Sequence, residues 1–214
     1  MVFFYTGYIL SAVSFVMFLV KFKTTFTGQK TNLFLIYLFC LFFVETLALL
    51  LSSFQFNNFF YNVLILLEFN ILLFLYKNIS EDRLTNKVIK LGVVLYNVVY
   101  FCSSFFYGIS IFKTKLNTIA PVFGSLFIAV TLLLFLREML LSEDIVNYKK
   151  NIFFWISTGL LLYYLGTLPL TAIFNFMKEG SNFFELYRIQ HVLTIIMHSC
   201  FIIGLLWSWN KSKL

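Results

Sequence analysis

The chain has 214 residues, of which 61% are hydrophobic and only 12% are charged, and its mean hydropathy is +0.91. A soluble domain carries about 25% charged residues, so the composition excludes an ordinary soluble globular protein and predicts an integral membrane protein. The net charge of +7 would suggest nucleic-acid binding in a soluble protein. Here the basic residues stand in short segments between apolar runs, so we expect the lipid bilayer as the partner and no nucleic acid.

Seven apolar runs are long enough to cross the hydrocarbon core, which takes about 20 helical residues. In chain order they cover residues 3–20, 32–53, 59–76, 90–111, 119–136, 152–175 and 190–209. No basic residue precedes the first run and Lys21 and Lys23 follow it, so we expect a retained helix and not a signal peptide. The sequence predicts one all-α domain over residues 1–214, an integral membrane bundle of seven transmembrane helices.

Two prolines fall inside the predicted helices. Pro121 stands in the first turn of the fifth run, where a helix tolerates the missing N–H. Pro169 lies inside the sixth run and should kink that helix, because it frees a backbone carbonyl. We expect Thr171 to compensate part of this loss.

The basic residues also predict the orientation of the chain. Four of them stand in the even-numbered loops, namely Lys113, Lys115, Lys178 and Arg188. The other twelve stand in the odd-numbered loops and the tail, namely Lys21, Lys23, Lys30, Lys77, Arg83, Lys87, Lys90, Arg137, Lys149, Lys150, Lys211 and Lys213. Because cytoplasmic loops carry the excess of Lys and Arg, the N-terminus is predicted outside and the C-terminus in the cytoplasm. Trp207 and Trp209 fit an interfacial belt at the cytoplasmic end.

Polar side chains at membrane depth are the candidate ligand-binding residues, because burying them without partners is costly. They are Glu45, Glu68, Asn97, Tyr163, Tyr164, His191 and His198. His191, Thr194 and His198 share one helical face at i, i+3 and i+7. If several helices turn such faces inward, the polar groups line a common cavity that opens toward the outside.

Each of these residues also has a structural interpretation. A glutamic acid in the middle of a span can be a protonated group that bonds a neighbouring helix. His198 can be a neutral packing residue that bonds a hydroxyl across helices. Asn97 and the tyrosines fit interhelical hydrogen bonding better than ligand contact, and Glu185 and Arg188 fit a solvated ion pair.

The sequence lacks the signatures of several membrane activities. The last run has no lysine for a retinal, and its two histidines lie on one face, where they cannot ligate one haem iron from opposite sides. Two histidines are too few for a seven-helix zinc hydrolase, and no hydrolase or nucleotide-binding motif is present. We therefore expect no cofactor and no metal, assign no catalytic residue, and favour a protein that is not an enzyme.

Two segments, "FYNVLILLEFNILLFLY" (60–76) and "NIFFWISTGLLLYYLGTLPLTAIFN" (151–175), carry a resemblance together with the histidine-bearing last run. The chain resembles small seven-helix bacterial membrane proteins of unassigned function, some of which are similar to the sensory half of membrane kinases. The resemblance implies sensing or partner binding, with an output protein encoded separately.

The leading hypothesis is a receptor or sensor in a bacterial cytoplasmic membrane. It would bind a small or lipid-like ligand in the outward-facing cavity and signal to a separate cytoplasmic or membrane protein partner. Three alternatives remain open: a proton-coupled small-molecule transporter, a membrane-embedded lipid hydrolase that uses carboxylates, and a membrane subunit of a larger complex.

Overall fold

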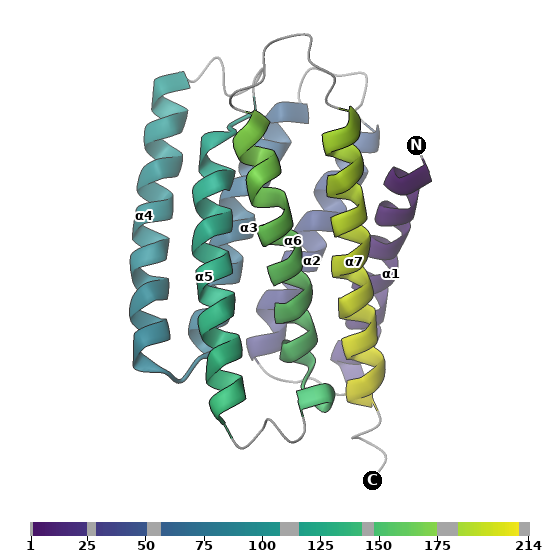
Figure 1. Ribbon diagram of the computed structural model, residues 1–214. Coiled ribbons are helices and arrows are strands. Elements are labelled where there is room, and N and C mark those ends of the chain that lie inside the picture. The colour runs from purple at the N-terminus through teal and green to yellow at the C-terminus, as the bar shows by residue number, and fades with distance from the viewer. Residues whose placement is uncertain are drawn as a thin grey trace.

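The computed structural model describes residues 2–24, 29–50, 57–107, 116–142, 148–174 and 184–209. These residues form seven helices. They are α1 (Val2–Thr24), α2 (Gln29–Leu50), α3 (Asn57–Ile79), α4 (Arg83–Tyr107), α5 (Ile119–Leu141), α6 (Ile152–Phe174) and α7 (Phe184–Trp209). Successive helices run in opposite directions, so α1 begins at one end of the bundle and α7 finishes at the other (Figure 1).

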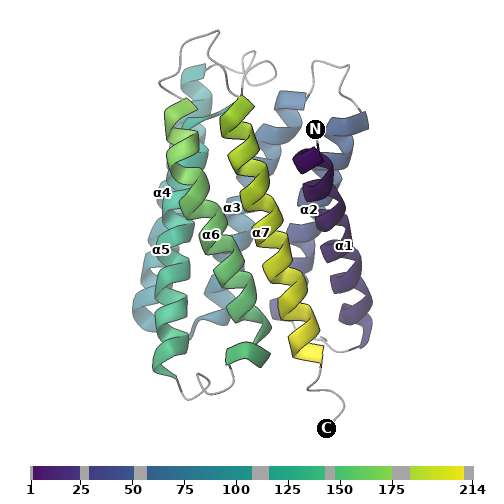
Figure 2. The ribbon, with the colours of Figure 1, turned by 45° about the vertical axis from the view of Figure 1, so that its right-hand side comes forward.

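Six of the helices form a closed ring, and α4 stands outside it. Each of α1, α2, α3, α5, α6 and α7 packs against the next, and α7 packs back against α1. Helix α4 packs against α3 and α5, which also contact each other directly. Two views of the ribbon show α4 at one side of the bundle and α1 and α2 at the other (Figures 1 and 2). Side chains that point inward from the six ring helices therefore share one interior.

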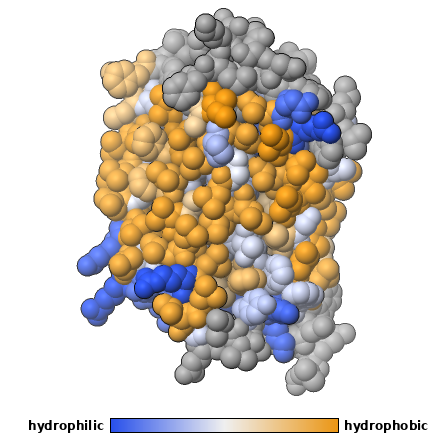
Figure 3. Space-filling view, viewed as in Figure 1, coloured by the Kyte–Doolittle hydropathy of each residue, from blue (hydrophilic) through white to orange (hydrophobic). Residues whose placement is uncertain are grey.

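The helices and the surface are those of a multi-pass membrane protein. Five helices are long and apolar enough to cross a membrane, over Asn58–Ile79, Arg83–Phe106, Ile119–Leu141, Ile152–Ile173 and Glu185–Ser208. The apolar stretches described in α1 and α2, Tyr5–Lys21 and Thr31–Leu47, are shorter. Apolar side chains cover the middle of the visible face and hydrophilic ones gather toward its ends (Figure 3).

Several helices extend beyond the apolar runs that predict them. Helix α4 begins at Arg83 and not at residue 90, α5 continues to Leu141, and α7 begins at Phe184. An apolar run marks only the part of a helix that suits hydrocarbon, whereas backbone hydrogen bonding continues through charged residues at the membrane surface. The predicted ends at residues 51–53, 108–111 and 175 lie outside the described residues.

Large aromatic side chains fill the interior of the ring. Phe34 of α2 meets Phe201 of α7 with ring centroids 5.2 Å apart, and Phe34 also packs edge-on against Phe18 of α1. Phe69 of α3 meets Tyr164 of α6 at 5.5 Å. The Phe34–Phe201 and Phe69–Tyr164 contacts each connect two helices that are not neighbours in the ring.

Helices α6 and α7 approach closely at glycines. A Cβ added at Gly159 of α6 would lie 2.9 Å from Cβ of Cys200 and 3.0 Å from the carbonyl oxygen of Met197. A Cβ at Gly204 of α7 would lie 2.6 Å from Cβ of Trp155. Small residues let membrane helices approach in this way, and dispersion contacts then stabilise the pair.

Pro169 lies within α6, which continues to Phe174. The Thr171 hydroxyl donates to the carbonyl oxygens of Thr167 and Leu168, at 3.1 and 3.0 Å. The carbonyl that a proline leaves without its helical partner is four residues earlier, at Leu165. These two Thr171 bonds therefore go to other carbonyls than the one for which compensation was expected.

Candidate functional site

The centre of the ring holds a carboxylic acid bonded to a tyrosine. The hydroxyl of Tyr164 on α6 donates to Oε1 of Glu68 on α3, at 2.6 Å. Tyr164 is buried, and its ring packs against Phe69. Both residues stand near the middle of their helices, so the bond crosses the ring at mid-depth. The sequence predicts both residues as ligand-binding, and the structure brings them together.

A third group at this place comes from α2. The Tyr37 side chain is 1% exposed, and its hydroxyl lies near the Tyr164 hydroxyl and within electrostatic range of Glu68. In the described part of the chain, this hydroxyl makes no hydrogen bond of good geometry; the polar group beside it is the Tyr164 hydroxyl, whose proton is donated to Glu68. A buried hydroxyl without a partner costs about 1–3 kcal/mol, so the position is one where an additional polar group would be stabilised.

Glu45 and Tyr163 stand beside this group, on α2 and α6. Glu45 lies within electrostatic range of Glu68, and Tyr163 within range of both carboxyl groups. The Tyr163 hydroxyl also lies near Gln190 and Thr194 of α7. Four ring helices, α2, α3, α6 and α7, thus contribute polar groups to one region. We call Tyr37, Glu45, Glu68, Tyr163 and Tyr164 the interior polar cluster.

His198 is joined to Glu45 through α1 rather than directly. The Ser11 hydroxyl donates to Oε2 of Glu45 at 2.9 Å. The Ser14 hydroxyl donates to the Ser11 carbonyl oxygen at 2.9 Å and lies 2.9 Å from Nδ1 of His198. Because the Ser14 proton is used on that carbonyl, His198 Nδ1–H is the donor to Ser14. The chain of contacts passes through a backbone carbonyl, which does not relay a proton, so it links α2, α1 and α7 structurally.

The remaining predicted residues lie elsewhere. Asn97 is on α4, outside the ring, where its amide donates to Asn70 Oδ1 at 2.8 Å and Asn70 donates back at 3.3 Å. This pair joins α3 to α4, so Asn97 does not line the interior with Glu68. We expected α4 to turn its polar face into a common interior. Helices α3 and α5 contact each other directly and close the ring, so α4 lies outside that interior. His191 is half-buried on α7, two turns nearer its N-terminal end than His198.

Sequence reasoning did not select three residues that matter here, Tyr37, Ser11 and Ser14. Ser11 and Ser14 stand at i, i+3 in an apolar helix. Two serines at that spacing in a membrane span are the signal that could have identified α1 as a partner of α2 and α7.

Lys21 provides a separate contact at the opposite end of α1. Its side chain is 4% exposed, and its Nζ donates to the carbonyl oxygen of Leu205 and to the Ser208 hydroxyl at 3.3 Å. A cation near the last carbonyls of α7 interacts favourably with the negative end of that helix. Lys21 therefore stabilises the α1–α7 contact.

A second polar structure lies at the C-terminal end of the bundle, in the turn between α3 and α4. Glu138 of α5 accepts hydrogen bonds from the Ser80 hydroxyl at 2.6 Å and from the backbone N–H groups of Glu81 at 2.8 Å and Asp82 at 3.2 Å. Asp82 accepts from the Thr85 N–H at 3.0 Å and hydroxyl at 2.9 Å, which caps α4. These bonds lower the pKa of the Asp82 carboxyl below its ordinary value.

The charged residues at the N-terminal end of α7 match their prediction. Arg188 and Glu185 form an exposed ion pair at 3.8 Å. In the part of the chain that the structure describes, no group of three His, Cys, Asp or Glu side chains could hold a metal ion. Lys113, Lys115, Lys178, Lys211 and Lys213, which the orientation argument uses, lie outside the described residues.

Comparison of the chain with protein-family models, curated proteins and solved structures found no match. Fold and site define the class: a multi-pass helical membrane protein whose ring of helices encloses a polar cluster.

Proposed function

We propose that this chain is a seven-span membrane receptor or sensor that binds a small or lipid-like ligand at the interior polar cluster. The supporting observation is the convergence of the Glu68 carboxyl, the Tyr164 hydroxyl and the unpartnered Tyr37 hydroxyl inside the ring. The Glu68 carboxyl accepts a hydrogen bond from the Tyr164 hydroxyl. The Tyr37 hydroxyl beside them has no hydrogen-bond partner of its own among the described residues. A ligand with a hydrogen-bonding group would satisfy Tyr37.

Partial exposure of the surrounding residues supports space for such a ligand. Glu45, Glu68 and Tyr163 are only partly buried and keep some accessible surface. Cross-ring pairs of helices make no close backbone contact among the described residues, so side chains alone fill the centre. Rotation of one of these side chains would be enough to admit a small group.

The seven-span arrangement and the orientation belong to the same proposal. Helices α1 and α2 have 23 and 22 residues. At about 1.5 Å per residue they reach roughly 33–35 Å, enough for a hydrocarbon core of about 30 Å. With the N-terminus outside and the C-terminus in the cytoplasm, the excess of Lys and Arg faces the cytoplasm of a bacterial cell.

Signalling would proceed through the cross-ring contacts. Glu68 and Tyr164 connect α3 to α6, and α6 also contains Pro169 and packs against α7 at Gly159. A ligand that bonds one packing of α6 more strongly than another shifts the population between them. A separate protein at the cytoplasmic side would then respond to the altered helix ends.

Thermal stability in detergent, measured against a library of polar and lipid-like compounds, tests the proposal. A compound at 100 times its dissociation constant stabilises the wild-type protein by about 2.7 kcal/mol. Glu68→Gln should lose most of this gain, because the amide has a different charge and hydrogen-bonding pattern. The matched control is Glu185→Gln, which changes an exposed carboxylate at the end of α7 and should keep it. If Glu68→Gln and Glu45→Gln both respond like the wild type, the interior site is contradicted.

A further inference from the structure

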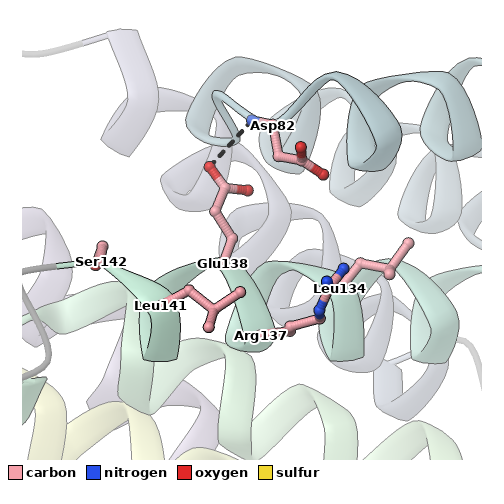
Figure 4. Close-up of a pocket in the computed structure, with 6 residues that line it drawn as sticks. All are labelled: Asp82, Leu134, Arg137, Glu138, Leu141 and Ser142. Atoms are coloured by element: carbon pink, nitrogen blue, oxygen red, sulfur yellow. Dashed lines mark hydrogen bonds between the residues drawn. The ribbon is translucent and has the colours of Figure 1, made fainter.

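A pocket lies beside the α3–α4 turn at the C-terminal end of the bundle. It has a volume of about 290 Å³ and is lined by Asp82, Leu134, Arg137, Glu138, Leu141 and Ser142. We call it the turn pocket. Asp82 belongs to the turn, and the other five residues belong to the last two turns of α5 and the residue after it (Figure 4).

The wall of the turn pocket is built before any ligand arrives. Glu138 holds the turn through three hydrogen bonds, and the Asn86 amide adds bonds to the carbonyl oxygens of Ser80 and Asp82 at 3.0 and 3.1 Å. A pocket with a preformed wall costs a ligand little ordering entropy.

The turn pocket carries two charges of opposite sign that do not pair with each other. The Asp82 carboxylate and the Arg137 guanidinium lie on the same side of Glu138 (Figure 4). They are within electrostatic range, yet no ion pair within 4.0 Å joins them in the described residues. Both Glu138 oxygens already accept hydrogen bonds from the turn. A ligand with one positive and one negative group could therefore fit between Asp82 and Arg137.

Helix ends with partial charges of both signs meet at the turn pocket. The C-terminal ends of α3 and α5 carry partial negative charge and the N-terminal end of α4 carries partial positive charge, and all three meet at the turn. A purely anionic ligand would meet Asp82 as well as Arg137, and like charges at close range are unfavourable.

Apolar side chains on α5 show at what depth the turn pocket lies. Leu134, Arg137 and Leu141 are spaced at i, i+3 and i+7 and share one helical face, and Leu141 is 75% exposed. The candidate span of α5 ends at Leu141, so the turn pocket sits where hydrocarbon gives way to lipid headgroups.

From these observations we propose that the turn pocket binds the headgroup of a zwitterionic phospholipid that carries a primary ammonium group. Arg137 binds the phosphate and Asp82 accepts from the ammonium, while Leu134 and Leu141 contact the start of the acyl chains. The inference rests on the membrane assignment and not on the proposed receptor activity.

Native mass spectrometry of the purified protein in detergent tests this. Phosphatidylethanolamine, phosphatidylglycerol and phosphatidylcholine with identical acyl chains are added at equal concentration. Partly exposed charge contacts each change affinity by roughly two- to fivefold. The wild-type protein should therefore retain phosphatidylethanolamine about two- to fivefold better than either other lipid.

Two variants and one control make the test specific. Arg137→Gln should lower phosphatidylethanolamine retention by about two- to fivefold, because it removes the charge that binds the phosphate. The turn should stay intact, because Arg137 is exposed and contributes none of the turn's hydrogen bonds described above. Asp82→Asn keeps an oxygen that can cap α4 and should remove the preference over phosphatidylcholine. Lys87→Gln changes an exposed cation of α4 that does not line the turn pocket and should leave retention unchanged.

Three results would overturn the proposal. They are equal or better retention of phosphatidylglycerol by the wild type, an equal loss in Lys87→Gln and Arg137→Gln, and unchanged lipid preference in Asp82→Asn. Should Asp82→Asn fail to fold, the comparison of Arg137→Gln with Lys87→Gln still decides.

Discussion

Gly159→Ala tests the packing on which the ring depends. The added Cβ would lie 2.9 Å from Cβ of Cys200 and 3.0 Å from the Met197 carbonyl oxygen. A backbone oxygen inside a helix does not move aside easily, and overpacking of this kind costs about 1–3 kcal/mol. Replacing glycine by alanine in a helix interior returns about 0.5–1 kcal/mol. We expect a net loss of about 1–2 kcal/mol.

Gly92→Ala is the matched control. Its Cβ would lie 3.6 Å from the Phe127 side chain, an ordinary contact, so only the gain in helix propensity remains. In thermal unfolding of the detergent-solubilised protein, about 1 kcal/mol corresponds to about 2–4 °C at this chain length. Gly159→Ala should melt about 2–8 °C below the wild type, and Gly92→Ala at or above it. Equal shifts in the two variants would refute the close approach of α6 and α7.

Three further predictions concern the polar contacts. A double-mutant cycle of Asn70→Ala and Asn97→Ala should give a coupling of about 0.6–2 kcal/mol, and additive losses in thermal stability would show that the amide pair is not formed. Glu138→Ala should cost about 2 kcal/mol and weaken hydrogen-exchange protection at residues 80–82, whereas unchanged protection there would contradict the role given to Glu138. Bonds from Thr85 lower the pKa of Asp82 in the folded protein. The Asp82 cap therefore stabilises the folded state fully above the unfolded pKa of about 4, and this stabilisation is lost as the pH falls through the folded pKa. Protection of the amides at residues 83–86 should therefore decrease on acidification, and protection that is constant down to pH 2 would exclude this cap.

The helices could be predicted from the sequence because each one satisfies its own backbone in an apolar run. Which helices pack against one another could not be predicted. Lipid solvates apolar side chains as well as a protein core does, so α5 is almost uniformly apolar around its circumference and no pattern marks which face meets α3 or α6. The position of α4 outside the ring, and with it the placing of Asn97, depends on those neighbours.

The candidate site was partly predictable for a related reason. Polar residues at membrane depth need partners, which drew attention to Glu68 and Tyr164, and these two bond each other. The same reasoning predicts the hydroxyl partner that His198 has in Ser14. The partners themselves depend on rotation and depth of each helix. The three bonds from Glu138 to the α3–α4 turn depend on the turn's backbone, which no residue pattern shows.

The most direct test of the interior site is the thermal stability of Tyr37→Phe without any added ligand. If the Tyr37 hydroxyl is a buried group waiting for a ligand, its removal relieves a desolvation cost of about 1–3 kcal/mol. The account predicts that Tyr37→Phe melts about 2 °C or more above the wild type and no longer gains stability from ligands. A lower melting temperature would mean that the hydroxyl is already satisfied within the protein, and it would contradict a ligand site at the centre of the ring.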